Sequence, residues 1–362
     1  MTKQLLSVCV AVIMLASTAN AQQAGADAEW IRPDHPGAPP VWGIRNGIVV
    51  GLWPAPIEHP RPGADGGPRG LLRIGYEWKG SIYHINYMAI EPVVAGQMEF
   101  SEISPSRVDG KWGKIMWAGD TPDPGRFSTT STVQGVLTHP DAAHPEKTTL
   151  SLYIFMEQFA NGAHPYLRIS ISNDRPEELC MEVFHLPGSA AMERCGITAT
   201  MGNYSRLRNL YLKNEVVNAR KLYAGFEGTG FVEKDPYPAK QMMRTRNGDY
   251  IVMAQPDESL SELASWPENE KYAARWSWRY RPFYRLTQYW RHPGSDSTHT
   301  LQVRVNGRAK YWSGGSNNPA AYIDIPGGPA YENFELREQY YPGVKCWFGL
   351  SRKRIEEIKN ME

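Results

Sequence analysis

Three short segments of the chain place polar and aromatic side chains at every second position, the spacing that puts them on one face of a β-strand. The three faces are Tyr204, Arg206 and Arg208; Arg285, Tyr289 and Arg291; and Tyr331, Asn333 and Glu335. Planar hydrogen-bond donors beside flat rings suit the recognition of a sugar. The same residue types are ordinary on a solvated sheet face, so a sugar-binding cleft and a solvated strand face both remain open.

The first of these faces requires an anion, because Arg206 and Arg208 repel each other unless a negative charge lies between them. That anion is either a ligand or a carboxylate of the protein, and Glu182 or Glu193 is the candidate. A continuous strand would place further small polar residues on the same face, unless Gly202 forms a bulge that reverses the alternation. The face would then comprise Thr198, Thr200, Gly202, Tyr204, Arg206 and Arg208.

Other polar residues could complete such a cleft. Gln288 and Trp290 lie in the second segment and Asn333 and Glu335 in the third, where they could orient a sugar. His84 shares a strand face with Asn86, and Tyr83, Tyr87 and Glu91 lie on the opposite face. His84 is a candidate proton donor or acceptor, with a structural role as the alternative.

These residues must be positioned by a β-rich fold. Aromatic and β-branched runs recur between glycines and prolines, as at Tyr166–Ser172, followed by the turn residues 173–176. The remaining strand candidates are Gly70–Tyr76, Leu150–Phe155, Leu179–His185, Gly196–Met201, Asp249–Ala254, Leu301–Val305, Tyr331–Leu336 and Val344–Leu350. Short turn-punctuated strands without long helices between them predict an all-β fold, a large antiparallel β-sandwich. Helix is expected only at residues 260–265 and, at the C-terminus, residues 351–361.

The chain divides into four parts. Residues 1–21 have a positive start at Lys3, an apolar run and the small-residue cleavage site Ala19-Asn20-Ala21, which predict a signal peptide and a periplasmic or extracellular protein. Residues 22–70 are rich in proline and glycine and predict an extended N-terminal arm, with a strand candidate at Gly47–Trp53. Residues 71–350 predict a single sandwich domain and residues 351–362 a terminal helix.

Charge, cysteines and metal motifs narrow the function classes. Without Lys3 the chain has 38 basic and 38 acidic residues and no basic run, so we expect no nucleic-acid partner. No segment after residue 21 has the ~20 apolar residues of a membrane span. No metal-ligand motif occurs, and we expect no cofactor. Cys180 and Cys195 are the nearest pair for a disulfide, although their spacing does not establish one.

An exported, aromatic-rich chain with these turn-punctuated strands and Arg/Tyr strand faces resembles the galactose mutarotase-like supersandwich proteins of bacterial polysaccharide degradation, over about residues 71–350. The resemblance implies a β-sandwich that acts on carbohydrate. No diagnostic motif of that group is matched, so no catalytic residue is carried over from it.

The leading functional hypothesis is a polysaccharide lyase acting on an acidic polysaccharide or oligosaccharide. β-Elimination requires a cation that neutralises the uronate and a group that removes the proton beside it. Arg206, Arg208 and Arg291 could neutralise, Tyr204, Tyr289 or His84 could transfer the proton, and Gln288 and Asn333 could orient the sugar. One alternative is a glycoside hydrolase pairing Glu335 with Glu91, Glu182 or Asp324; the other is a glycan-binding protein without turnover.

Overall fold

The computed structural model describes residues 29–35, 38–53, 71–108, 110, 113–125, 133–139, 147–200, 205–257, 286–295, 299–312 and 322–361. These residues form two large antiparallel sheets and a separate two-stranded hairpin. The predicted all-β sandwich with a short C-terminal helix is confirmed.

Sheet 1 has ten strands. In spatial order they are β1 (Trp30–Ile31), β2 (Val41–Ile44), β3 (Ile48–Trp53), β4 (Leu71–Trp78), β5 (Ser81–Val94), β12 (Arg194–Thr200), β22 (Ala330–Arg337), β19 (Gln302–Arg308) and β15 (Asp235–Pro238), with β6 (Gln97–Met98) paired to β5. The described part of the proline-rich segment therefore contributes β1, β2 and β3 to this sheet rather than an arm laid over it. The strand expected at Gly47–Trp53 is β3.

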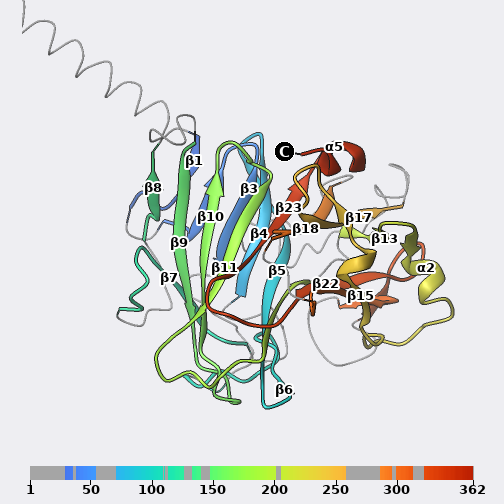
Figure 1. The fold of residues 1–362 in the computed structure, drawn as a ribbon, viewed down its shortest axis with the longest axis horizontal. Helices are drawn as coiled ribbons and strands as arrows, with labels where there is room; N and C mark the ends of the chain where they lie inside the picture. The colour runs from blue at the N-terminus through green and yellow to red at the C-terminus, as the bar shows by residue number, and fades with distance from the viewer. Residues whose placement is uncertain are drawn as a thin grey trace, which may run out of the picture.

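Sheet 2 has eleven strands. Their order is β14 (Val216–Asn218), β13 (Leu207–Tyr211), β17 (Tyr250–Pro256), β18 (Thr287–His292), β23 (Val344–Ser351), β11 (Glu178–His185), β10 (Pro165–Ser172), β9 (Thr149–Met156) and β7 (Met116–Gly119), with β16 (Met243–Arg244) beside β17 and β8 (Val136–Thr138) beside β9. The hairpin is β20 (Lys310–Trp312) and β21 (Tyr322–Asp324), and the helices described are α2 (Ala219–Leu222), the 3-10 turn η2 (Ala239–Gln241) and α5 (Ile355–Lys359). In Figure 1 the green strands β9, β10 and β11 lie beside the blue and cyan strands β3, β4 and β5.

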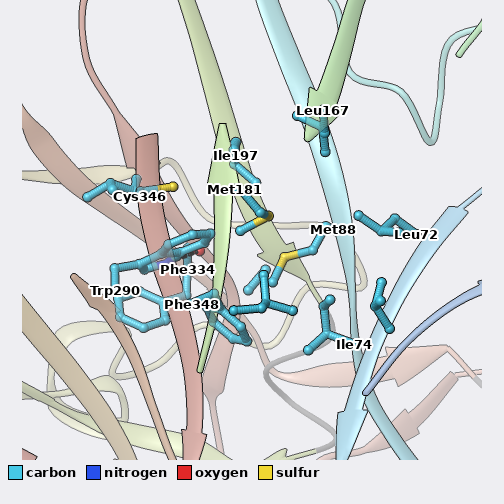
Figure 2. Close-up of a cluster of buried hydrophobic side chains, with 14 of the residues drawn as sticks. Leu72, Ile74, Met88, Leu167, Met181, Ile197, Trp290, Phe334, Cys346 and Phe348 are labelled. Carbon is cyan, nitrogen blue, oxygen red and sulfur yellow. Dashed lines mark hydrogen bonds between the residues drawn. The ribbon is translucent and has the colours of Figure 1, made fainter. Parts of the chain in front are cut away.

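The core lies between the two sheets and follows from strict alternation along the strands. In β10, Leu167, Ile169 and Ile171 are buried and alternate with half-buried Arg168 and Ser170. Figure 2 shows side chains from both sheets meeting there. The labelled residues are Leu72, Ile74, Met88, Leu167, Met181, Ile197, Trp290, Phe334, Cys346 and Phe348. Each such side chain removed from water contributes roughly 1.5–3 kcal/mol, so this layer holds the sandwich together.

Hydrogen bonds also cross the core. Asn86 Nδ2 on β5 donates to Gln288 Oε1 on β18 at 2.6 Å, and Gln288 Nε2 donates to Asn86 Oδ1 at 3.1 Å. The Trp290 indole N–H donates to the Phe334 carbonyl at 2.9 Å. Gln288 and Trp290 thus join the sheets inside the molecule, because buried polar groups need such partners.

The three described cysteines, Cys180, Cys195 and Cys346, are free, so the Cys180–Cys195 disulfide is not formed. Cys180 lies in sheet 2 and Cys195 in sheet 1. Burial raises the pKa of the Cys180 thiol to about 12, which leaves it uncharged and weakly reactive at neutral pH.

Candidate active site on the outer face of sheet 1

The outer face of sheet 1, turned away from the core, carries an unusual set of buried polar side chains. Along β4, β5, β12 and β22, residues on the core side such as Met88, Ile197 and Phe334 alternate with polar ones. The polar members are Arg73, Tyr87, Glu91, Thr198, Thr200, Asn333 and Glu335, of which all but Tyr87 are buried. A sheet face exposed to water needs no such burial, so this face is covered and chemically distinct.

Tyr87, Thr200 and Glu102 form a hydrogen-bonded group at the centre of this face. Tyr87 and Thr200 are direct neighbours in the register of β5 and β12. Thr200 Oγ1 donates to Glu102 Oε1 at 3.0 Å, and Tyr87 is also hydrogen-bonded to the Glu102 side chain. Tyr87 and Glu102 are only partly exposed.

Glu102 reaches this position from the loop after β6 because the loop is pinned to β5. Ser101 N–H donates to the Ile90 carbonyl at 3.1 Å, and Ile90 N–H donates to Ser101 Oγ at 3.1 Å. The Lys114 amide donates to the Ser101 carbonyl at 2.7 Å. These bonds fix the loop on the sheet, and the carboxyl itself is held there by its hydrogen bonds from Thr200 and Tyr87.

The pKa values of Glu102 and Tyr87 are both raised, and that of Glu102 comes close to neutral pH. Burial raises the pKa of Glu102 to about 8, against the lowering effect of its hydrogen bonds from Tyr87 and Thr200 and of the Arg73 charge. Burial, followed by the charges of Glu102 and Glu332, holds the pKa of Tyr87 well above its ordinary value. The tyrosine thus keeps its proton, while the glutamate exchanges its own within the physiological range.

Arg73 lies beside the tyrosine, and His84 lies near Arg73. The Arg73 guanidinium lies over the Tyr87 ring at 4.7 Å, and both residues come from paired positions of β4 and β5. A register shift between Ile74 and Gly75 separates His84 from Asn86, so His84 contacts the outer side of sheet 1 near Arg73 while Asn86 enters the core. The prediction that His84 and Asn86 share a face is therefore wrong. Burial, and then the Arg73 charge, lowers the pKa of His84 well below its ordinary value, so the ring is neutral.

A second cluster on the same face joins Glu91 and Glu335 through Lys234. Lys234 Nζ donates to Glu91 Oε1 at 2.7 Å and Oε2 at 2.9 Å, and to Glu335 Oε2 at 2.8 Å. The nearest oxygens, at 2.7 Å and 2.8 Å from one nitrogen, therefore lie no more than about 5.5 Å apart. Burial and the Glu335 charge raise the pKa of Glu91, and the Lys234 ammonium opposes them.

The surroundings of this pair are equally ordered. Thr198 Oγ1 donates to Glu91 Oε1 at 2.6 Å, and Arg304 lies 3.4 Å from Glu335. Gly196 lies opposite Glu91 in the register, and a Cβ at this glycine would lie only 2.8 Å from Glu335 Oε1. A Cβ at this position would therefore force the Glu335 carboxylate to shift from its place beside Glu91.

The predicted row of Tyr204, Arg206 and Arg208 is not an extension of the Thr198 and Thr200 face. β12 ends at Thr200 in sheet 1, whereas Arg208 belongs to β13 in sheet 2. Alternation counted across the intervening residues therefore has no meaning. Arg206 is buried and has a left-handed backbone with φ of 49°. Tyr204 lies outside the described residues.

Arg208 has protein groups around its guanidinium. It donates to the Pro326 carbonyl at 2.7 Å, the Gly328 carbonyl at 2.9 Å and the Pro329 carbonyl at 3.0 Å, and Asp257 lies at 3.4 Å. Asp257 also accepts from Arg220, so one carboxylate lies between two arginines. Burial and the charge of Arg220 lower the pKa of Arg208 to about 10.

Neither glutamate expected beside these arginines takes that place, so the Glu182 or Glu193 prediction is wrong. Glu182 lies 3.5 Å from Arg168, and Glu193 accepts a hydrogen bond from the Gly96 amide. Arg208 thus fixes the turn before β22, and its anion is the protein's own Asp257.

Tyr289 and Arg291 share a face as predicted, but that face is the outer side of sheet 2, away from Tyr87. Arg291 Nη2 donates to Glu178 Oε1 at 2.6 Å and Nη1 to Asp249 Oδ2 at 2.5 Å. Tyr289 O–H donates to Glu178 Oε2 at 3.1 Å, and its ring packs beneath Ile358 of α5. Burial, and then the Glu178 charge, raises the pKa of Tyr289 well above its ordinary value. Arg285 lies outside the described residues.

Within β22, Asn333 and Glu335 lie on the outer face and Tyr331 does not. The register shifts between Asn306 and Gly307, which leaves Glu332 as an extra residue in β22. Tyr331 consequently enters the core, where its hydroxyl donates to the Val217 carbonyl at 2.9 Å. The expectation that all three share one face is wrong because of this bulge.

The structure therefore brings together His84, Tyr87, Glu91, Asn333 and Glu335 on sheet 1 and leaves the arginines Arg208 and Arg291 elsewhere. Glu102 and Lys234 were not predicted, since both come from irregular segments that carry no strand periodicity. Arg73 was not predicted either, although its alternation with Leu72 and Ile74 on β4 could have indicated it.

In the described residues, no three His, Cys, Asp or Glu side chains are placed to hold a metal ion. None of the helices in the described ranges has the length and hydropathy needed to span a bilayer. The fold and this face define an all-β sandwich with a covered, ionisable outer sheet face. No family model, curated protein or solved structure matches the chain.

Proposed function

We propose that the protein is an exported polysaccharide lyase that cleaves a uronic-acid-containing glycan on the outer face of sheet 1. The observation that carries the proposal is the Tyr87–Glu102 pair, a tyrosine that keeps its proton bonded to a carboxyl with a pKa of about 8. Elimination needs one group to remove a proton and another to supply one. Glu102 can lose its proton near neutral pH and act as the base, whereas Tyr87 keeps its proton and can act as the acid. Export is part of the proposal and rests on the signal-like residues 1–21.

The chemistry assigns one role to each residue. The ionised Glu102 carboxylate takes the proton from the sugar carbon beside the uronate, and the electrons of that C–H bond form a carbon–carbon double bond. The bond to the neighbouring glycosidic oxygen breaks, and the Tyr87 hydroxyl protonates the leaving oxygen. The products are an unsaturated uronate end and a new hydroxyl end, so no oxidant or other reactant is consumed.

Arg73 and His84 support this assignment by their charge states. The Arg73 guanidinium beside Tyr87 is a buried positive charge close to the proposed proton-transfer groups, and in the proposal it offsets the negative charge that develops during proton removal. His84 is neutral, so it adds no second positive charge that would lower the pKa of Glu102.

The test is release of ultraviolet-absorbing unsaturated ends from a panel of uronate polysaccharides by the mature protein. Tyr87→Phe and Glu102→Gln should each lower the rate by about 10²–10⁴-fold. Tyr153→Phe, a half-buried tyrosine on the outer side of sheet 2, is the matched control and should leave the rate unchanged. Undiminished activity in both variants, or saccharide binding without any turnover, would refute the assignment.

A glycoside hydrolase is the second candidate, and the proximity of Glu91 and Glu335 favours it. Their nearest oxygens lie at most about 5.5 Å apart, which is below the roughly 6.5–9.5 Å of inverting glycosidases and leaves a retaining pair as the form to test. The raised pKa of Glu91 suits a proton donor. Lys234 would have to leave the pair for a sugar to enter between the carboxylates.

The pH dependence of the rate separates the two candidates. A lyase with Glu102 as base becomes faster as pH rises toward about 8, because only the ionised carboxylate accepts a proton. A hydrolase with Glu91 as acid becomes slower as pH rises, and it releases reducing ends without ultraviolet absorbance. Loss of activity in Glu335→Gln alone, with Glu102→Gln fully active, would establish the hydrolase instead.

A further inference from the structure

A concave basic pocket lies on the sheet 2 side of the molecule, built from segments far apart in sequence. Its volume is about 380 Å³. The cations that line it are Lys213 after β13, Lys240 in η2, Arg244 in β16 and Lys359 in α5. None of the candidate active-site residues on sheet 1 contributes to it.

The walls of the pocket are held by packing and backbone bonds. Ile358, next to Lys359, is fully buried against Met243 and Ile251 of the sheet. The Lys213 amide donates to the Gln241 carbonyl at 2.8 Å, which joins the end of β13 to η2. The cations therefore occupy a preformed concavity rather than four unrelated surface positions.

Arg244 is held in place within this pocket. Its guanidinium lies 3.2 Å from the centre of the Tyr250 ring, and Nη1 donates to the Gly248 carbonyl at 2.5 Å. Only part of its donor set is used, since a guanidinium carries five N–H groups. A stacked, oriented arginine of this kind is suited to a planar carboxylate.

These four cations have no acidic counterpart in the described part of the chain. Ion pairs there join other lysines and arginines, for example Lys234 with Glu91 and Arg291 with Glu178. The chain as a whole is almost neutral, with 39 basic and 38 acidic residues, so the excess of positive charge in this pocket does not follow from the overall composition. Like charges brought together in one concavity repel, and an anionic ligand relieves that repulsion.

We infer that this pocket is a second binding site for the carboxylates of an acidic saccharide, separate from the catalytic face. The choice of saccharide rests on the proposed function; the anionic character of the ligand rests on the four cations alone. The site holds a polyanionic substrate on the enzyme and raises its concentration near the catalytic face.

The experiment measures binding of pentagalacturonate by calorimetry at low ionic strength, in the Glu102→Gln protein so that the probe is not cleaved. The double variant Lys213→Ser/Lys240→Ser should weaken one binding event per chain by about tenfold. Lys79→Asn/Lys147→Ser removes the same charge from the exposed loops of other elements and should leave binding unchanged. Thermal unfolding of both double variants checks that each is folded.

The outcomes separate this site from the catalytic proposal. Unchanged pentagalacturonate binding in Lys213→Ser/Lys240→Ser overturns the site, even where the wild-type protein is an active lyase. Binding that depends on Lys213 and Lys240 supports the site, and if the wild-type protein also cleaves no polysaccharide, the lyase proposal is refuted while the site stands. Equal affinity for inorganic phosphate and pentagalacturonate overturns the saccharide assignment, because a site built for several carboxylates along a chain favours the longer ligand.

Discussion

Among the lysines that the structure describes, Lys234 should be the most costly to remove. Its ammonium lies within 2.9 Å of three carboxylate oxygens from Glu91 and Glu335, and the side chains of these two glutamates are 1% and 0% exposed. Lys234→Met would leave two buried carboxylates facing each other, with Glu91 deprived of its cation and Glu335 left with Arg304 at 3.4 Å. Breaking a buried ion pair by removal of one partner costs about 3–5 kcal/mol, and we expect this range for the free energy of unfolding at pH 8.

The cost should depend on pH in a defined direction. Without Lys234 the pKa of the carboxylate pair rises further above its unfolded value, so the folded state takes up a proton that the unfolded state lacks. Such a raised carboxyl pKa leaves the stability intact at low pH and lowers it as pH rises through the folded pKa. The difference between Lys234→Met and the wild type should therefore shrink from pH 8 to pH 5.

Urea unfolding at pH 5, 7 and 8 measures this difference. Lys234→Met/Glu91→Gln should recover more than half of the lost stability, because a neutral amide replaces one of the two facing charges. Lys221→Met, an exposed lysine of α2, is the matched control and should change the stability by less than about 0.5 kcal/mol. A loss below about 1 kcal/mol in Lys234→Met, or a loss equal at all three pH values, would refute the reasoning.

Three further changes test the remaining electrostatic and steric arguments. Because the pKa of Glu102 is raised from 4.5 to about 8, the free energy of unfolding of the wild type should fall as pH rises between these values, by at most about 1.4 kcal/mol per pH unit. Thermal unfolding of Glu102→Gln should show a flatter pH profile, without the loss of stability between pH 4.5 and pH 8. Arg291→Met should cost about 3 kcal/mol in urea unfolding at pH 7, since it leaves buried Glu178 without its closest cation, and an unchanged midpoint would contradict the ion-pair assignment. Gly196→Ala should cost about 1–3 kcal/mol, because its Cβ would lie 2.8 Å from Glu335 Oε1; the variant Gly196→Ala/Glu335→Ala should regain part of that loss.

The strands and the sandwich were predictable because alternation is a local signal. Segments such as Tyr166–Ser172 and Val344–Leu350 alternate cleanly and correspond to β10 and β23. The short terminal helix was predictable from its composition, and α5 occupies residues 355–359 within the expected span. Alternation alone also placed Tyr87 and Glu91 together on one side of β5.

The site was predictable only in part because strand periodicity fails at bulges and between sheets. One extra residue in β22 separates Tyr331 from Asn333 and Glu335, and one in β5 separates His84 from Asn86. Periodicity also gives no indication of which sheet a strand joins. That is why Arg208 and Thr198, which share a parity in the sequence, belong to different sheets.

Long-range pairing accounts for the remaining difference. Lys234 and Glu91 are 143 positions apart, and Glu102 meets Thr200 across 98 positions. Neither Lys234 nor Glu102 lies in a segment whose pattern marks it, since loops are positioned by backbone hydrogen bonds that residue types do not reveal. The basic pocket has the same origin, because its four cations come from four separate elements.

The distribution of buried charge argues that the outer face of sheet 1 serves more than stability. On sheet 2, Arg208 and Arg291 are each matched by several fixed acceptors, which is what a structural role requires. On sheet 1, burial instead raises the pKa of Glu91 above its ordinary value and that of Glu102 to about 8. Apolar residues of similar size at such positions are often neutral or stabilising, so a face built for stability alone would not need these two acids. The proton transfer that we propose does need them, which supports placing the proposed chemistry on this face.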